Sequence, residues 1–488
     1  MSSEAADPRR WIALILLCAT QFMLIIDVSI VNVALPTIEV DLKFNNSSLQ
    51  WVASAYALTF GGFLLLGGRC ADLLGRRRLF MAGLALFTLA SLACGFASSS
   101  NFLIGARAVQ GLGAAMIAPA ALSILSTTFQ EGNERNKALA VWGAVSGAGG
   151  AVGVLMGGVL TEYVGWEWVF YVNAPIGLAA ILLAPRLLRE SRVEDAIRSF
   201  DVVGAILVTA SLSLLVYTVV KTDQYHWFSG RTLGFFAVSV VLMIGFLLNE
   251  QRASSPLLPL SIFRLPTIVG ANVVGFMLGA AIFAMFFLLA LYMQQPPGLH
   301  YSAIRSGVGY LLVACTIIAS AGASQALVGR FGVRNVLLSG LALLTLGLLF
   351  FTRVSPHGTY LGDLAPGFVL AGIGLGFAFI PVTIAALMGI SNDEAGLASG
   401  LINTSQQIGG AVGVALLATV FTSRTADLRA SGTAADVAFT DGLSRAFLVG
   451  ALMAVLALGA TLLLIRGGSP EAEAAASGAP IASGAHQS

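Results

Sequence analysis

The stretch that decides the fold is Gly68-Arg-Cys-Ala-Asp72-Leu-Leu-Gly75-Arg76-Arg77-Arg78. Apolar runs precede and follow it, so it is predicted to form a tight connection between two membrane-spanning helices. Glycine at 68 and 75 lets two helix ends approach closely and turn within a few residues. The arginines place this connection on the cytoplasmic side, because short loops rich in Lys and Arg stay in the cytoplasm.

The composition is that of an integral membrane protein. Of 488 residues, 57% are hydrophobic and only 10% are charged, and the mean hydropathy is +0.87, whereas a soluble domain carries about 25% charged residues. The net charge of +2 and the lack of a recurring basic face argue against a nucleic-acid partner. The 4 cysteines lie in or beside apolar runs without paired spacing, so neither a disulfide framework nor a metal site is expected.

A helix that spans a membrane needs about 20 mostly apolar residues. The first apolar run is too long for a signal peptide, so it is expected to be a retained helix. An even number of spans puts both termini on one side, and most of the 26 Lys and Arg residues then share the side of the opening stretch. Both termini are therefore predicted to be cytoplasmic. Fourteen segments qualify as spans: 11–35, 50–68, 79–98, 101–127, 137–161, 168–187, 201–221, 231–250, 266–292, 304–326, 334–352, 364–389, 396–422 and 444–466.

An internal repeat divides these spans into two halves. Gly149-Gly-Ala-Val-Gly-Val154 recurs letter for letter as Gly409-Gly-Ala-Val-Gly-Val414, at an offset of 260, and Pro119 matches Pro381 at an offset of 262. Transporters built from parallel repeats of this kind bind substrate near the membrane midplane, between the halves. The predicted organisation is a cytoplasmic N-terminus (1–10), a six-helix half (11–187), two inserted helices with their linkers (188–264), a second six-helix half (265–466) and a disordered cytoplasmic tail (467–488).

The opening stretch resembles the cytoplasmic signature loop of the major facilitator superfamily, and nearly the whole chain resembles its fourteen-helix drug:proton antiporter branch. Two departures from that branch are Val154, where proline is usual, and Glu167, where arginine is common. The resemblance implies an all-α membrane fold and a transporter driven by the proton gradient, which is not an enzyme and needs no cofactor. The motifs that carry it are Asp27–Pro36, Arg107–Gly113, Trp166–Phe170, Asn173–Gly177 and a glycine ladder of Gly143, Gly147, Gly150, Gly153, Gly157 and Gly158.

Two charged residues fall well inside the predicted spans: Asp27 and Arg107. A charge at the bilayer centre costs about 2.5–3.5 kcal/mol on insertion scales, so such residues are usually paired or functional. A rise of 1.5 Å per residue puts Asp27 about 13 Å and Arg107 about 9 Å from the outer ends of their helices, at similar depth. Burial favours a neutral carboxyl and a nearby guanidinium favours the charged form, so the pair is predicted to couple transport to protons. Gln110 is expected to hold the guanidinium.

The alternative is a static ion pair that only joins the two helices, but a permanently buried pair is a poor stabiliser. The opening stretch (Gly68, Asp72, Gly75, Arg76, Arg77, Arg78) is expected to form a cytoplasmic gate. Asp72 would lie at the positive end of helix 396–422. The arginines would meet Asp393 and Glu394, or Glu131 and Glu134, unless they are merely solvated charges that set topology.

The glycine ladder is expected to give a tight, sliding contact with the opposite half, although close helix packing alone would also explain it. The substrate pocket is predicted from polar, aromatic and Met side chains at membrane depth, which accommodate varied apolar ligands. Helices 266–466 carry no acid in their interiors, so neutral, zwitterionic or monocationic amphiphiles are expected as substrates. The candidate pocket residues are Gln21, Phe22, Asn32, Trp51, Tyr56, Asn173, Asn272, Met277, Phe287, Tyr292, Asn403, Gln406 and Gln407.

These expectations describe a multidrug efflux pump that confers antibiotic resistance or exports a metabolite. It would act as a monomer in the lipid of the bacterial plasma membrane and exchange a small amphipathic molecule for protons. A proton-coupled importer of a small nutrient is the first alternative. A receptor or intramembrane enzyme is disfavoured, because all 4 histidines lie in loops or the tail and no HExxH or GxSxG motif occurs.

Overall fold

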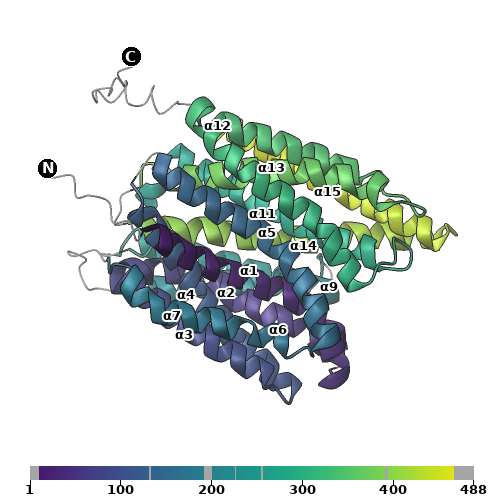
Figure 1. The fold of residues 1–488 in the computed structure, drawn as a ribbon, viewed down its shortest axis with the longest axis horizontal. Helices are drawn as coiled ribbons and strands as arrows, with labels where there is room; N and C mark the ends of the chain where they lie inside the picture. The colour runs from purple at the N-terminus through teal and green to yellow at the C-terminus, as the bar shows by residue number, and fades with distance from the viewer. Residues whose placement is uncertain are drawn as a thin grey trace.

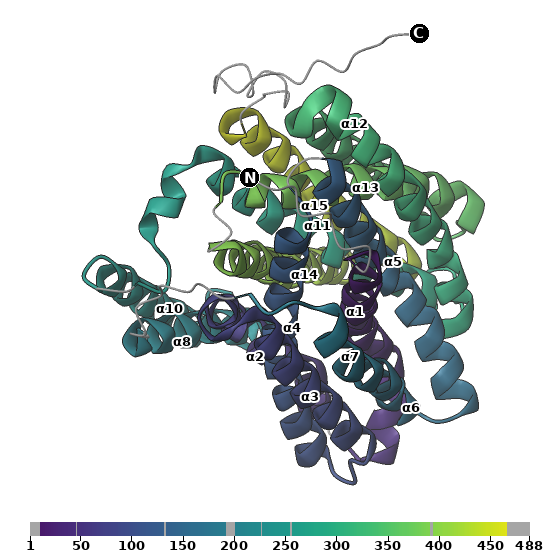
Figure 2. The same ribbon diagram turned by 60° about the vertical axis from the view of Figure 1, so that its left-hand side comes forward.

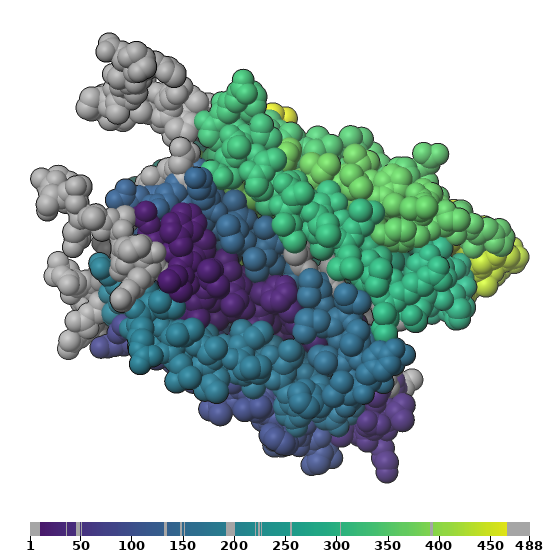
Figure 3. Space-filling model, viewed as in Figure 1, coloured from purple at the N-terminus to yellow at the C-terminus, as the bar shows by residue number. Residues whose placement is uncertain are grey.

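The computed structural model describes residues 10–44, 46–130, 133–191, 201–225, 227–253, 256–390 and 394–465, and all regular structure within them is helical. The helices form two groups that lie side by side, the N-terminal group in purple and blue and the C-terminal group in green and yellow (Figure 1). The space-filling view shows the same two groups meeting along a seam (Figure 3).

The N-terminal group agrees with the first six predicted spans. The predicted span 168–187 is divided, because a one-turn helix precedes the longer one. Several helices are longer than the predicted spans, because the helix continues beyond the apolar residues that would cross the hydrocarbon. The bounds are α1 Arg10–Asp41, α2 Asn46–Leu74, α3 Arg76–Gly95, α4 Ser100–Thr128, α5 Asn133–Tyr163, α6 Trp168–Tyr171 and α7 Asn173–Leu187.

The insert and the C-terminal group follow. The helices α8 and α10 form a hairpin at the side of the bundle, where α8 packs against α2 (Figure 2). The insert comprises α8 Val202–Val220, α9 Thr222–Tyr225, α10 Gly230–Glu250 and the short η1 Leu260–Arg264. The C-terminal group comprises α11 Pro266–Gln294, α12 Ala303–Phe351, the short η2 Tyr360–Leu364, α13 Ala365–Leu387, α14 Ala395–Ala430 and α15 Ala435–Leu464.

The helix α12 covers two predicted spans. Its 49 residues are interrupted at Gly332, where φ is 79° and ψ is 161°. Within the described residues, 12 helices are long and apolar enough to cross a membrane. The second arm of α12, together with α5, whose apolar part Val152–Tyr163 is shorter, raises the number of crossings to the fourteen that the sequence predicts.

The repeated hexapeptide makes equivalent contacts in both groups. A Cβ on Gly149 would lie 2.9 Å from Ile25 of α1, and one on Gly409 would meet the Phe276 carbonyl oxygen of α11. The two copies of the motif therefore pack α5 on α1 and α14 on α11, the first helix of each group. This arrangement supports the repeat that the sequence indicates.

The helix α5 packs on α12 and α13 of the opposite half, as predicted, but most of the glycine ladder faces its own half. Gly150, Gly153 and Gly157 lie against Ser29, Ile26 and Ile30 of α1. Among the ladder glycines with described neighbours, Gly143 alone faces the opposite half, where a Cβ would lie 3.0 Å from Ile380 of α13. The reason is the rotation of α5 about its axis: its glycines admit α1, whereas Leu155 packs against Gly307 of α12. Gly147 and Gly158 also lie in α5.

Candidate functional site

The structure brings Asp27 of α1 and Arg107 of α4 into direct contact. Arg107 Nη1 lies 2.7 Å from Asp27 Oδ2, and the two residues are 1% and 0% exposed. Gln110, one turn along α4, accepts a hydrogen bond from Arg107 Nη1 at 2.7 Å through Oε1 and donates one to Asp27 Oδ1 at 2.7 Å through Nε2. The amide therefore bridges the two charges and holds both in place.

Asn173 joins this network, which corrects its assignment to the substrate pocket. Its Nδ2 donates to Asp27 Oδ1 at 2.9 Å and to Ser91 Oγ at 3.0 Å, and the residue is fully buried. Asn173 is the first residue of α7. Counted from the start of the predicted span 168–187, it lies about 8 Å along the helix, close to the value of about 9 Å for Arg107, so the same count could have placed the two residues at similar depth.

Tyr56 is also predicted to line the pocket, but it packs on the guanidinium of Arg107 instead. Its ring centroid lies 4.3 Å from the Arg107 Cζ, and the residue is 2% exposed. Arg107 Nε donates to the Val52 carbonyl oxygen at 3.1 Å, so α2 holds the guanidinium from a second side. An aromatic face attracts a cation, and the attraction is larger where water is excluded.

Every described side chain that hydrogen-bonds to Asp27 is a donor: Arg107, Gln110 and Asn173. An ionised carboxylate accepts hydrogen bonds only, whereas a protonated carboxyl also carries a donor of its own. The geometry around Asp27 therefore fits the deprotonated form.

Near the C-terminal end of α2, Asp72 contacts the start of α14, as the sequence predicts. Its Oδ1 accepts a hydrogen bond from the Gly396 N–H at 3.1 Å, and its Oδ2 accepts one from the Leu397 N–H at 3.0 Å. Both amides belong to the first turn of α14, where unpaired N–H groups and the helix dipole attract a carboxylate. Arg76 Nη2 contacts the same carboxylate at 2.8 Å. Asp72 thus ties the two helix groups together.

Gly68 makes this junction sterically possible. A Cβ at position 68 would lie 2.5 Å from the Gly396 carbonyl oxygen and 3.1 Å from Gly400 Cα. Any larger residue would therefore push α2 and α14 apart. Gly75 has a φ of 105°, which strains any other residue, and it ends the connection between α2 and α3.

The remaining arginines pair with a partner that the sequence did not predict. Glu190, in the segment after α7, lies 3.7 Å from Arg77 Nε and 3.7 Å from Arg78 Nε. Of the expected partners, Glu134 instead pairs with Arg10 at 2.7 Å, and Asp393 and Glu131 lie outside the described residues. This partner depends on the path of the segment after α7, which lies against the start of α3. There the backbone N–H groups of Arg76 and Arg77 donate to the Ser191 carbonyl oxygen and to Glu190 Oε1.

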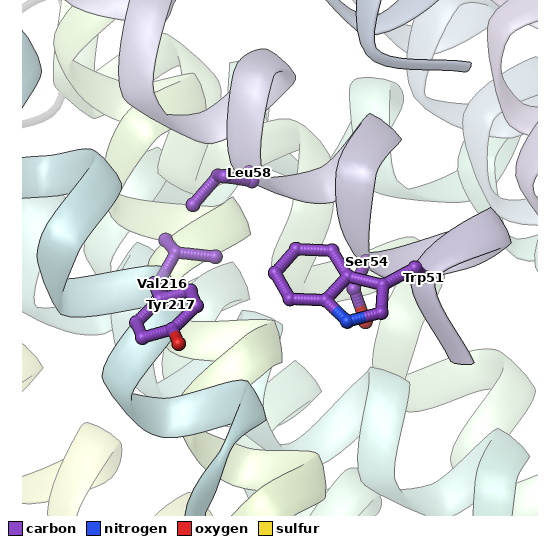
Figure 4. A pocket seen from close by; sticks show the side chains of 5 residues that line it. All are labelled: Trp51, Ser54, Leu58, Val216 and Tyr217. Atoms are coloured by element: carbon purple, nitrogen blue, oxygen red, sulfur yellow. The ribbon is translucent and has the colours of Figure 1, made fainter. Parts of the chain in front are cut away.

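Two other candidate pocket residues have structural contacts instead. Tyr292 is fully buried and donates to the Ser355 carbonyl oxygen at 2.9 Å. Trp51 lines a narrow crevice between α2 and the insert, together with Ser54, Leu58, Val216 and Tyr217 (Figure 4). Its indole ring lies 5.8 Å from that of Tyr217, so it faces α8 and not the seam between the halves.

The remaining candidate pocket residues differ in their hydrogen bonds. Asn32, Asn272 and Asn403 each donate to the carbonyl oxygen four residues earlier in their own helix. In Gln21 and Gln406, one side-chain atom is buried without a hydrogen-bond partner: Oε1 in Gln21 and Nε2 in Gln406. The others have no described hydrogen bond that defines a role: Phe22, Met277, Phe287 and Gln407 are partly buried or exposed residues of α1, α11 and α14.

The family model described as the Major Facilitator Superfamily matches residues 17–414. The chain belongs to the major facilitator superfamily. The resemblance in the opening stretch is thereby confirmed, and with it the all-α fold.

Relatives of this superfamily member cover most of its length. It is 38% identical over 464 residues to the puromycin resistance protein of Streptomyces alboniger, covering 94% of this chain and 92% of the relative. It is 40% identical over 429 residues to the cephamycin export protein of Amycolatopsis lactamdurans, covering 87% of each. The tetracenomycin C resistance and export protein of Streptomyces glaucescens is 34% identical over 420 residues, with 86% and 77% covered.

A solved structure has a similar fold. The human organic anion transporter MFSD10 matches with a TM-score of 0.65, covering 94% of this chain and 100% of that chain, at 15% sequence identity. At this identity the likeness concerns the fold alone.

Proposed function

We propose that this transporter exports small amphipathic molecules, such as drugs, antibiotics or metabolites, across the cytoplasmic membrane in exchange for protons. The observation that carries the proposal is the buried Asp27, which is paired with Arg107 and surrounded by donors. The relatives are named for resistance and export, which supports the outward direction. The proton gradient supplies the energy, so no cofactor is needed.

Proton binding would act through the hydrogen-bond pattern of the site. When a proton neutralises Asp27, its carboxyl gains an O–H donor, although the neighbouring side chains that bond to it are also donors. Arg107 at the same time loses its counter-charge. The network must then rearrange, which moves α1, α4 and α7 relative to one another, because each of these helices contributes at least one residue to it. Substrate and proton thereby favour different arrangements of the N-terminal half.

In this proposal, the contact of Asp72 with α14 is a cytoplasmic gate, which couples the rearrangement of the network to the opening of the substrate pathway on the cytoplasmic side. The Asp72 carboxylate contacts α14 only while the cytoplasmic ends of the two halves are together, so it favours the outward-facing state. In this proposal the halves 11–187 and 265–466 rock about their seam in a monomer, and both termini stay in the cytoplasm.

The test is substrate-induced proton release from energised inverted vesicles that contain wild type or Asp27→Asn, across a panel of amphiphiles. Wild type should release protons when a substrate is added, and Asp27→Asn should not, although it inserts at a normal level. Asp436→Asn removes an acid at the start of α15, far along the chain from the network, and serves as the matched control. Full activity of Asp27→Asn, or net proton-driven uptake in intact cells, would contradict the proposal.

A further inference from the structure

The side-chain amide of Asn173 is hydrogen-bonded at one end only. Its Nδ2 donates to Asp27 Oδ1 at 2.9 Å and to Ser91 Oγ at 3.0 Å, which uses both of its N–H groups. Its Oδ1 is buried and has no hydrogen-bond partner among the described residues. While Asp27 is ionised, the NH2 end of the amide must face it, because a carboxylate accepts hydrogen bonds only. The unpartnered carbonyl oxygen of Asn173 therefore belongs to the ionised state of the site.

Gln110, whose amide also contacts Asp27, is hydrogen-bonded at both ends. Its Nε2 donates to Asp27 Oδ1 at 2.7 Å. Its Oε1 accepts from Arg107 Nη1 at 2.7 Å and from the Cys94 thiol at 3.6 Å. A guanidinium carries donors only and keeps its proton in proteins. Turning the Gln110 amide around would set its NH2 group against Arg107, so Gln110 keeps one orientation whatever the charge of Asp27.

Protonation of Asp27 changes which partners the carboxyl needs. Arg107 contacts Oδ2, so the proton adds to Oδ1, and the new O–H group needs an acceptor. A buried donor without an acceptor costs about 1–3 kcal/mol. Half a turn of the Asn173 amide would bring its carbonyl oxygen to this O–H group. Tyr56 Oη is also buried without a partner, but its ring packs on Arg107 and no described hydrogen bond joins it to Asp27.

Ser91 of α3 can follow the turn of the amide. Its hydroxyl accepts from Asn173 Nδ2 and donates to the Phe170 carbonyl oxygen of α6 at 2.9 Å, and all three residues are fully buried. Once the amide has turned, the Asn173 carbonyl oxygen can accept the hydroxyl proton of Ser91 in place of the Phe170 carbonyl oxygen. The change at Asp27 of α1 would then extend through α7 and α3 to α6.

We propose that Asn173 is a hydrogen-bond switch, which donates to Asp27 when the carboxyl is ionised and turns to accept from it when the carboxyl is protonated. Arg107 and Gln110 keep their contacts in both states, because a protonated carboxyl oxygen can still accept a hydrogen bond. The inference rests on the proposed proton coupling and names the residue through which the proton on Asp27 alters the packing of neighbouring helices.

The test is infrared difference spectroscopy of the purified protein in lipid membranes, recorded between acid and alkaline pH. Asparagine labelled with carbon-13 in its side-chain carbonyl separates the bands of these amides from those of the backbone. On acidification of wild type, we expect a protonated-carboxyl band from Asp27 to appear. One labelled carbonyl band should shift to lower frequency, because the Asn173 carbonyl gains a hydrogen bond. Both changes should be absent from Asp27→Asn, which assigns them.

Asn173→Leu should lose the shifting carbonyl band and keep the carboxyl band of Asp27, and Asn173→Ser takes its place if the leucine variant does not fold. Asn335→Leu in α12 is the control, because Asn335 donates to the Phe331 carbonyl oxygen of its own helix and should not affect the shift. A carboxyl band of Asp27 without a shift of any labelled carbonyl would overturn the switch alone and indicate another acceptor, such as Tyr56. The absence of an Asp27 carboxyl band at every pH would overturn the proton coupling as well, so the two failures are distinguishable.

Discussion

Asp27 accepts hydrogen bonds from three side chains that belong to two other helices. A hydrogen bond to a charged group contributes about 1.5–3 kcal/mol, so these contacts together offset much of the cost of burying the carboxylate. Because α1, α4 and α7 each contribute, the charge state of one residue is linked to the packing of three helices.

Arg107→Ala should alter the pH dependence of transport. Without the guanidinium, Asp27 loses its counter-charge and one of its three hydrogen-bond donors. We expect substrate-induced proton release at neutral pH to fall about tenfold or more, and its dependence on pH to change. Proton release from inverted vesicles between acidic and alkaline pH measures this, and an unchanged profile would support a static ion pair.

The Asn173→Leu variant tests whether Asn173 belongs to the network around Asp27 or to the substrate pocket. The change removes the hydrogen bonds to Asp27 and Ser91 and nearly keeps the volume, so the pH profile of transport should shift. The apparent substrate affinity should stay within about twofold, because the buried Asn173 belongs to the network and not to the pocket. Concentration series of one substrate at several pH values provide both quantities. A change in affinity with an unaltered pH profile would return Asn173 to the pocket.

The element that links chemistry to movement is the junction of α2 with α14. It combines a carboxylate on a helix N-terminus with glycines that let the two backbones touch. The insert adds a second link along the same seam, because α8 packs on α2 and Trp227 Nε1, in the loop before α10, donates to Thr419 Oγ1 of α14 at 2.8 Å.

Asp72→Asn should slow turnover more than it weakens substrate binding. The neutral amide loses the attraction of a carboxylate to a helix N-terminus, worth about 0.3–2 kcal/mol, and its pairing with Arg76. We expect the maximal transport rate to fall about fivefold, with the half-saturating concentration nearly unchanged. Initial export rates in vesicles give both values, and Asp436→Asn is again the matched control. A loss of substrate affinity with a normal maximal rate would contradict the gate.

For the whole molecule, the seam between the halves should open on the cytoplasmic side during each cycle. It must also close there, and Gly68 is a point where α2 and α14 touch. In Gly68→Val a Cβ would lie 2.5 Å from the Gly396 carbonyl oxygen, so the side chain should hold the two helices apart. We expect the initial export rate to fall about tenfold, because overpacking costs about 1–3 kcal/mol.

Gly459→Val in α15 provides the control, because a Cβ at that position meets nothing within 4 Å. Initial export rates in vesicles measure both variants, with the amount of inserted protein compared on a gel. If Gly68→Val transports at the wild-type rate, the tight contact of α2 with α14 is not part of the transport cycle.

Much of the fold was predictable because the bilayer imposes simple rules on sequence. Long apolar runs must be helices, arginine-rich loops stay in the cytoplasm, and an exact repeat implies equivalent halves. The depth of Asp27 and Arg107 followed from the rise per residue, and the contact of Asp72 with α14 followed from charge and topology.

What the sequence could not supply is the rotation of each helix about its axis. Depth along a helix comes from counting residues, but the neighbour that a side chain meets depends on how all the helices pack. Tertiary packing therefore decided that Asn173 and Tyr56 surround the charged pair, that the glycine ladder faces α1, and that Glu190 receives Arg77 and Arg78. The sequence by itself determined the membrane fold, the repeat and the depth of the charges, because hydrophobicity and helix rise act locally along the chain.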